Sequence, residues 1–204
     1  MRKFLAAVSL VLFSSSCVPA DNPEFEGLAD TSYPLVDISG KIYCSSTKIG
    51  DNAFLTAAHC LENPMGGLIW GKNGAVSFRI VKVDKEADLA LITAAIDGPD
   101  APVLPYEPDR FARILAVGYP HGLALWITEG LWIGDVYDDD LKKNHSGASA
   151  PVAPGNSGGG VFIKYLNKWY LVAVVQMRAT DSAHIGIVSK PSVLKAFLSG
   201  EEKN

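Results

Sequence analysis

Short apolar runs alternate with clusters of turn residues along most of the chain. In the first half these runs span residues 36–44, 53–56, 67–70, 75–83 and 89–93. In the second half they span residues 114–123, 127–136, 161–165 and 169–177. The runs are rich in β-branched residues and bounded by glycine, proline, asparagine and aspartate, which is typical of strands. Strands this short and this closely spaced indicate an all-β fold built from barrels rather than from β-α-β units.

Two segments carry a helical pattern instead. Residues 57–61 predict a single helical turn, and residues 190–198 predict an amphipathic helix. Between the two strand-rich halves, residues 95–109 contain four prolines and form the predicted connection. We therefore expect one barrel in residues 35–107, and a second barrel together with the terminal helix in residues 108–204.

The N-terminus has the pattern of an export signal. Arg2 and Lys3 precede an apolar run of ten residues, 4–13, that only one serine interrupts. Such a run is too short to span a bilayer, which needs about 20 residues, but it suits the hydrophobic region of a signal peptide. We therefore expect residues 1–17 to be a leader and the polar, acidic residues 18–34 to be a flexible tether.

The end of this leader offers two processing sites. Three serines followed by Cys17 resemble a bacterial lipobox, in which the cysteine is lipidated and becomes the new N-terminus. Ordinary signal-peptidase cleavage after residues 18–20 is the alternative. The first site predicts a periplasmic or cell-surface lipoprotein that is attached to the membrane through Cys17. The second site predicts a secreted protein.

Composition and charge narrow the range of partners. The 204 residues are 48% hydrophobic, which suits an ordinary globular core, and their formal charge is −4. An acidic chain without a long basic run offers little to a phosphate backbone, so we expect no nucleic-acid partner. The carboxylates of residues 138–140 are of the type that binds calcium, but no glycine-turned ligand pattern follows, which favours a solvated loop. We expect neither a metal nor a cofactor.

Three motifs carry candidate chemistry. In GNSGGGV, residues 155–161, a serine lies in a glycine-rich turn before an apolar strand. Nucleophilic catalysis requires a hydroxyl on a tight turn with backbone N–H groups that face the same point, and those of Gly155 and Ser157 can converge on one oxyanion. The motifs LTAAHC and DLALI supply His59 and Asp88. The order of histidine, aspartate and serine along the chain is that of the chymotrypsin type.

Together these motifs resemble those of the trypsin-like serine proteases, and GNSGG is similar to the HtrA (Deg) branch and its short bacterial relatives. The resemblance implies two antiparallel six-stranded β-barrels with a short C-terminal helix. It also implies an exported endopeptidase that cleaves proteins or peptides through an acyl-enzyme intermediate. His59, Asp88 and Ser157 would be the catalytic residues, and Gly155 and Ser157 would form the oxyanion hole.

The same resemblance assigns several further features. It implies a disulfide between Cys44 and Cys60, because trypsin-like proteases tie the residue after their histidine to an upstream cysteine. Zymogen-type trypsins carry an ion-pairing aspartate just before the nucleophile, where this chain has Asn156, so we expect no activation by a freed N-terminus. No PDZ module follows the protease domain, and we therefore expect no PDZ-mediated assembly.

A gapless count from the serine places the primary specificity pocket of this family. The candidate substrate-binding residues are Pro151, Gln176, Met177, Arg178 and Gly186. Pro151 occupies the position where trypsins carry the aspartate of the pocket floor, so a preference for arginine or lysine is not expected. Gly186 leaves the slot open, because a side chain there would block it.

An alternative function is a catalytically silent trypsin-like fold that acts as a protein-binding module. Such proteins commonly lose a triad residue or an oxyanion glycine, and this chain keeps both. The sequence therefore favours an active peptidase over the binding module.

Overall fold

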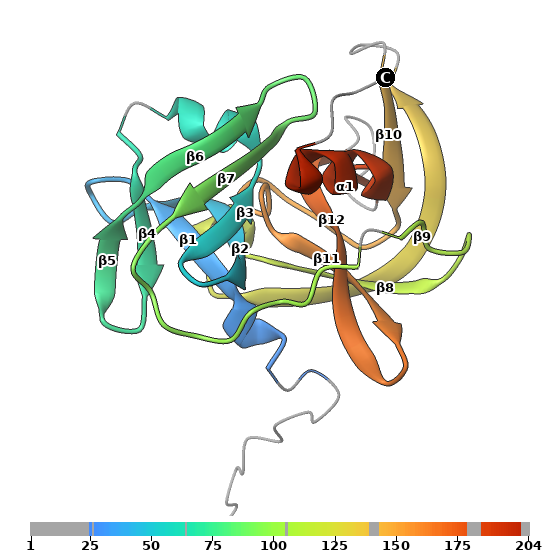
Figure 1. The fold of residues 1–204 in the computed structure, drawn as a ribbon, viewed down its shortest axis with the longest axis horizontal. Coiled ribbons are helices and arrows are strands. Elements are labelled where there is room, and N and C mark those ends of the chain that lie inside the picture. The colour runs from blue at the N-terminus through green and yellow to red at the C-terminus, as the bar shows by residue number, and fades with distance from the viewer. Residues whose placement is uncertain are drawn as a thin grey trace, which may run out of the picture.

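The computed structural model describes residue 25 and residues 27–63, 65–104, 106–138, 143–178 and 185–200. Two strand-rich halves lie side by side, and the C-terminal helix packs beside the second half (Figure 1). The all-β prediction is confirmed, because nearly all regular structure in these ranges is strand. No helix within them is long and apolar enough to cross a membrane.

The first half is a seven-stranded antiparallel sheet in the spatial order β5-β4-β1-β2-β3-β7-β6. Its strands are β1 (Ser32–Val36), β2 (Ile42–Gly50), β3 (Ala53–Thr56), β4 (Leu68–Gly71), β5 (Gly74–Ser77), β6 (Arg79–Asp84) and β7 (Leu89–Thr93). The edge strands β5 and β6 are not paired with each other within the described residues. This half is therefore an open sheet of seven strands, whereas the resemblance implied a barrel of six strands.

Two apolar runs that predicted single strands each form two strands. In the run 36–44, the carboxylate of Asp37 accepts hydrogen bonds from the backbone N–H groups of Ser39 (2.8 Å) and Lys41 (3.0 Å). These bonds close a turn between β1 and β2, as short polar side chains commonly do. The run 75–83 is likewise divided between β5 and β6.

The folded domain begins earlier in the chain than the sequence predicts. The predicted tether extends to residue 34, whereas Leu28 is already 96% buried and β1 begins at Ser32. Residues Ala29–Thr31 form a short 3₁₀ helix, η2, directly before this strand. Residues 18–24 and 26 of the predicted tether lie outside the described part of the chain.

The second half is a closed six-stranded barrel, as expected, in the ring order β10-β13-β12-β11-β8-β9. Its strands are β8 (Arg113–Gly118), β9 (Trp126–Asp138), β10 (Lys143–Ala148), β11 (Gly160–Tyr165), β12 (Lys168–Arg178) and β13 (Gly186–Val188). The helix α1 (Pro191–Ser199) follows, with proline in its first turn and Gly200 in the left-handed conformation at its end. The predicted terminal helix is thus confirmed.

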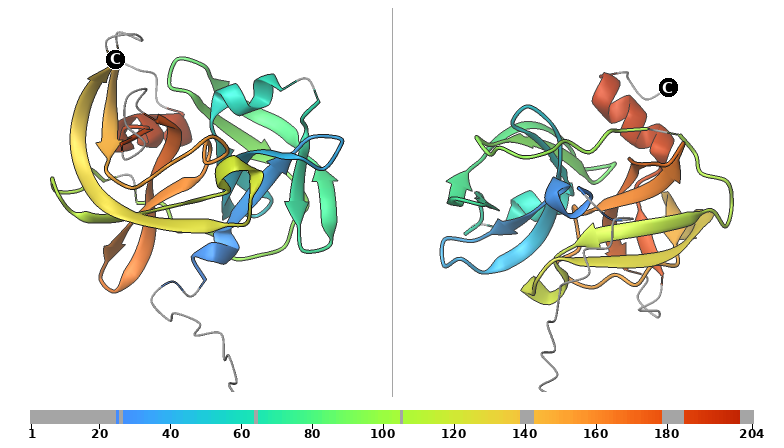
Figure 2. Two further views of the ribbon diagram at one scale, coloured as in Figure 1. Left: turned by 180° about the vertical axis from the view of Figure 1, so that it is seen from behind. Right: turned by 90° about the horizontal axis from the view of Figure 1, so that it is seen from below.

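The two halves remain distinct in the views from behind and from below (Figure 2), and one apolar cluster joins them. Leu55 and Leu89 from the first sheet pack in this cluster with residues of the barrel and of α1. The connecting segment is held by both halves: Ala101 N–H donates to Lys48 O (2.8 Å), and Leu104 N–H donates to Leu171 O (2.9 Å). Side chains that face one another across the boundary between the two halves are therefore held at defined positions.

Candidate active site

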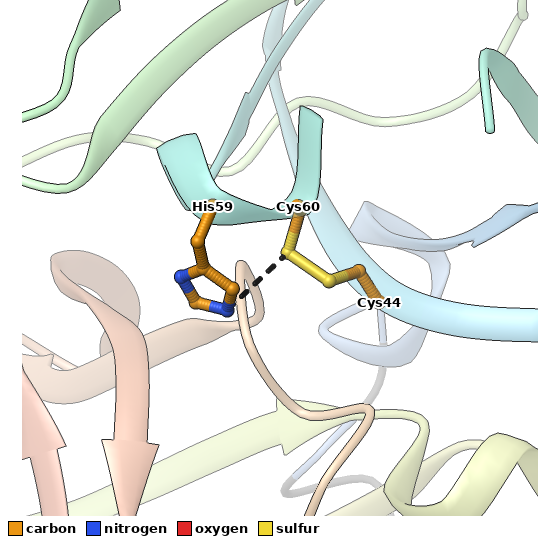
Figure 3. Close-up of side chains that lie close together, drawn as sticks. All are labelled: Cys44, His59 and Cys60. Atoms are coloured by element: carbon orange, nitrogen blue, oxygen red, sulfur yellow. Dashed lines mark hydrogen bonds between the residues drawn. A yellow bond between two sulfur atoms is a disulfide. The ribbon is translucent and has the colours of Figure 1, made fainter. Parts of the chain in front are cut away.

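His59 lies on a short 3₁₀ helix, η3 (Ala58–Glu62), which begins two residues after β3 ends. The helical turn predicted for this segment is confirmed. A disulfide between Cys44 on β2 and Cys60 anchors η3 to the sheet (Figure 3), as the resemblance implied.

The side chains of Cys44, His59 and Cys60 form a candidate metal-ligand group, with one ligand atom of each within 4.8 Å of the others. Because the two sulfur atoms are bonded to each other, neither offers the thiolate that a metal would bind.

Asp88 lies in the turn between β6 and β7, in a left-handed backbone conformation (φ 49°). Its carboxylate accepts a hydrogen bond from the backbone N–H of His59 (2.9 Å) and contacts Nδ1 of the same residue at 2.9 and 3.1 Å. A carboxylate only accepts hydrogen bonds, so Nδ1 carries the proton and Nε2 keeps its lone pair in the neutral ring. This hydrogen bond raises the pKa of His59 above its ordinary value of 6.5, while burial of the ring opposes the rise.

The loop that carries Ser157 is held by its carbonyl groups. Ser45, on β2, donates its backbone N–H to Ser157 O (2.8 Å) and its hydroxyl to Gly155 O (2.7 Å). The Ser45 hydroxyl also accepts a hydrogen bond from Tyr119 N–H (3.0 Å). The fully buried Ser45 therefore joins the first sheet to both ends of the Gly155–Ser157 segment, a role that no local sequence pattern indicated.

The backbone N–H groups of Gly155 and Ser157 have no acceptor among the described residues. Gly155 has φ 99°, and a Cβ at this position would collide with Tyr119 O, so no other residue fits here without strain. The bonds to Ser45 hold the loop through the carbonyl groups of Gly155 and Ser157 and do not occupy these two N–H groups. They are the groups that the sequence predicted for an oxyanion hole.

The Ser157 hydroxyl donates to the backbone carbonyl of Gln176 (3.1 Å), and no hydrogen bond joins it to His59 in this structure. The two residues are nevertheless neighbours: Sγ of Cys60 lies 3.9 Å from His59 Nε2 and 3.6 Å from Ser157 O. A serine hydroxyl rotates about χ1, and catalytic hydrogen bonds in substrate-free proteases often form only with the substrate. The structure thus brings the three predicted residues together, with the hydroxyl turned to a carbonyl.

A cleft of about 530 Å³ lies at this point, between the two halves. Its lining, among the described residues, is His59, Lys85, Glu86, Asp88, His145, Val152, Ala153, Pro154, Ser157, Val175, Gln176 and Met177. The cleft therefore contains the three candidate catalytic residues and a mainly apolar wall from the barrel.

The five predicted substrate-binding residues divide into two groups. Gln176 and Met177 line the cleft, while Pro151 and Gly186 are not among its described lining residues. Gly186 pairs with Arg178 in the barrel, and a Cβ on Gly186 would lie 3.2 Å from a methyl group of Val152, which does line the cleft. Arg178 is the last residue of β12 and is likewise not among the described lining residues.

His145 is one of the cleft residues that sequence reasoning missed. It lies on β10, and its Nδ1 is 3.1 Å from Oε1 of Gln176. In the sequence it lies in a polar segment, residues 143–146, where no pattern distinguishes a cleft residue from a solvated one. His121, by contrast, lies in the short helix η4 (Pro120–Gly122) and is not among the described lining residues of the cleft.

Comparison with known protein families and structures gives a consistent result. A family model described as "Trypsin-like peptidase domain" matches residues 39–174, which is two thirds of the chain and includes all three candidate catalytic residues. No curated protein sequence matches the chain.

Several solved structures share the fold. The active form of the Rv3671c protease from M. tuberculosis has a TM-score of 0.73 at 17% identity, covering 98% of this chain and 92% of that one. The serine endoprotease from Yersinia pestis has a TM-score of 0.70 at 19% identity, covering 87% and 64%. The HtrA-type protease AlgW, solved with a tripeptide, has a TM-score of 0.72 at 17% identity, covering 87% and 62%.

Proposed function

Because the chain belongs to the trypsin-like peptidase family, we propose that it is a serine endopeptidase whose catalytic residues are His59, Asp88 and Ser157. The observation that carries this proposal is the pairing of Asp88 with His59 Nδ1 in the same cleft as Ser157. That pairing directs the lone pair of Nε2 away from the carboxylate, as a general base requires. The N–H groups of Gly155 and Ser157, which have no acceptor among the described residues, supply the oxyanion hole.

The proposed reaction proceeds in two steps. Ser157 Oγ attacks the carbonyl carbon of the scissile peptide bond, and its proton passes to His59 Nε2. The C–N bond then breaks, and His59 returns the proton to the leaving amine. Water hydrolyses the resulting ester with His59 again as the base. Asp88 keeps the ring in the correct tautomer and stabilises its charged form throughout.

Two substitutions test this assignment by their effect on the cleavage of casein. Ser157→Ala is expected to lower kcat by a factor on the order of 10⁶, because it removes the nucleophile. Asp88→Asn is expected to lower kcat by about 10⁴-fold, because an asparagine amide favours the wrong tautomer of His59. Wild-type turnover in Ser157→Ala would show that the nucleophile lies elsewhere.

The cleft lining supports a preference for an apolar side chain on the amino-terminal side of the cleaved bond. Val152, Ala153, Pro154, Val175 and Met177 form its barrel wall. None of these residues carries a charge that would hold arginine or lysine, in agreement with proline rather than aspartate at position 151. A peptide-library cleavage profile tests this preference, and dominant cleavage after basic residues would contradict it.

We further propose that the protein is exported and anchored by a lipid on Cys17, which lies outside the described residues. If Cys44 and Cys60 are bridged, Cys17 is the third and unpaired cysteine. Lipidation removes its free thiol, and two or more acyl chains hold a protein firmly at a membrane. Mass spectrometry of the mature N-terminus and membrane fractionation of wild type and Cys17→Ser test this proposal. A lipid-free N-terminus at Asp21 with all protein soluble would instead indicate simple secretion.

A further inference from the structure

A buried pair of polar side chains, His145 and Gln176, lies directly behind the proposed catalytic residues. Gln176 is 1% exposed and His145 is 8% exposed. The pair spans two strands that are not neighbours, because β13 lies between β10 and β12 in the barrel. Gln176 is the extra residue of a β-bulge. Val175 pairs with Val188, and Met177 pairs with Ile187, the residue adjacent to Val188, so Gln176 has no partner of its own on β13. Bulges are frequent beside active sites, where they redirect a side chain.

The hydrogen bonds of Gln176 have a defined direction. Its Nε2 lies 2.5 Å from the carbonyl of Ala87 and 3.4 Å from the carbonyl of Asp88. Only the NH₂ end of an amide can face two carbonyl oxygens, so Oε1 must be the end that faces His145. Nδ1 of His145 therefore donates to Oε1, and in the neutral ring its Nε2 carries no proton.

Gln176 thereby holds the backbone of the aspartate turn. Asp88 has a left-handed backbone conformation (φ 49°), which residues other than glycine adopt at a cost and which surrounding contacts must maintain. From one side, Ala87 N–H donates to the carboxylate of Asp84 (2.8 Å). From the barrel side, the amide of Gln176 binds the carbonyls of Ala87 and Asp88. These contacts hold the backbone from which the carboxylate that binds His59 extends.

Packing alone does not explain why a histidine occupies position 145. Its Nε2 is buried without a hydrogen-bond partner among the described residues. A buried polar atom without a partner is destabilising, and a phenylalanine of similar shape would avoid that penalty. Among the described residues, the hydrogen bond that a histidine provides here is the one from Nδ1 to Oε1 of Gln176.

We propose that Gln176 is a positioning residue for Asp88, and that His145 acts through Gln176 by fixing the orientation of its amide. This inference rests on the proposed peptidase function, since it assigns the pair a role in placing the carboxylate against His59. Neither residue touches the reacting atoms through its side chain. Substitution of either His145 or Gln176 keeps all three triad residues but displaces Asp88.

The test uses the variants His145→Phe, Gln176→Leu and their combination, with Ser146→Ala as the matched control. Ser146 is the buried neighbour of His145 on β10, and its hydroxyl has no partner among the described residues, so its loss should leave the rate unchanged and should not lower stability. Gln176→Leu is expected to lower kcat by up to roughly 100-fold, the scale of a misplaced catalytic group. His145→Phe is expected to lower kcat by less, while its Tm stays unchanged or rises.

Two readouts separate positioning from a merely structural role. If His145 acts through Gln176, the double variant should be no slower than Gln176→Leu alone, whereas independent effects would multiply. The charged groups that raise the pKa of His59 are Asp88 and Glu62. A displaced Asp88 should therefore lower the pKa of His59 toward 6.5, which NMR titration measures in the Ser157→Ala background without any turnover.

The outcomes distinguish the two proposals. If wild type cleaves no substrate and Ser157 reacts with no probe, the peptidase function itself is wrong. If wild type is active but His145→Phe and Gln176→Leu keep its kcat and the pKa of His59, the positioning role is wrong. A His145→Phe variant that loses activity only in proportion to a lower Tm would also overturn it.

Discussion

Replacing Ser45 by alanine tests how the proposed oxyanion hole is held in place. The Ser45 hydroxyl is fully buried, donates to Gly155 O (2.7 Å) and accepts from Tyr119 N–H (3.0 Å). Ser45→Ala removes both bonds at once and leaves the backbone bond from Ser45 N–H to Ser157 O intact. The substitution therefore loosens one end of the loop while its other end stays bound.

The size of the effect follows from the two groups that lose their partner. A buried polar group without a partner costs about 1–3 kcal/mol. The carbonyl of Gly155 is buried, while Tyr119 is only half-buried, so the second group costs less. We expect the free energy of unfolding to fall by about 2–3 kcal/mol, which for a chain of this length lowers Tm by roughly 4–12 °C. Loss of one oxyanion donor costs about 10²–10³ in kcat, so a displaced Gly155 should cost about tenfold or more.

The assay combines thermal unfolding with kcat on a peptide ester. Ser46→Ala is the control: Ser46 is the next residue, is equally buried and donates its hydroxyl to Tyr33 O (3.0 Å), away from the catalytic loop. It should lose about 1 kcal/mol of stability and keep its kcat. If Ser45→Ala lost stability but kept the kcat of the control, the geometry of the oxyanion hole would not depend on this hydroxyl.

Three further predictions follow from the site. Asp88 raises the pKa of His59 above 6.5, and catalysis needs the neutral ring, so kcat/KM should fall as the pH drops below this raised pKa. In Asp88→Asn the pKa of His59 should be lower, and the residual kcat/KM should therefore fall only at lower pH. Gly158→Ala should abolish activity and lower stability by about 2 kcal/mol or more, because Gly158 has φ 86° and a Cβ there would meet backbone and side-chain atoms of the first sheet. Truncated proteins that begin at any residue from 18 to 24 should have equal kcat/KM, because Asn156 cannot form an ion pair with a new N-terminus. An abrupt gain at a single start site would indicate zymogen control.

The parts of the site that the sequence predicted are those that local motifs carry. LTAAHC, DLALI and GNSGGG each place one functional side chain on a short turn or helix next to a strand, and the structure places His59, Asp88 and Ser157 in that way. The disulfide was predicted because Cys60 directly follows the histidine. The three catalytic roles themselves remain predictions that only the kinetic and labelling experiments test.

The supporting residues could not be predicted, because their contacts join distant segments. Ser45 and Gly155 are 110 residues apart, and Gln176 and Ala87 are 89 apart. A serine in a strand and a glutamine in a strand have no local pattern that shows which carbonyl they will meet. The bulge that redirects Gln176 arises from the pairing of β12 with β13. The apolar sequence pattern of residues 169–177 contains no sign of this bulge.

The first sheet differed from expectation for a related physical reason. Apolar runs reveal where strands pass through a core, but they do not reveal turns that one polar side chain closes. Asp37 closes such a turn and divides the run 36–44 into two strands. Whether edge strands then pair to close a barrel depends on the curvature of the whole sheet, and β5 and β6 remain apart.

Covalent labelling by a fluorophosphonate probe tests the central claim most directly, because the probe reacts only with an activated serine beside a working oxyanion hole. The account predicts stoichiometric labelling of the wild type, with peptide mapping that places the adduct on Ser157, and no labelling of Ser157→Ala. Labelling should also fall as the pH drops and His59 becomes protonated. A folded wild type that remains unlabelled at neutral pH would contradict the account and indicate the alternative function, a trypsin-like fold that binds proteins without cleaving them.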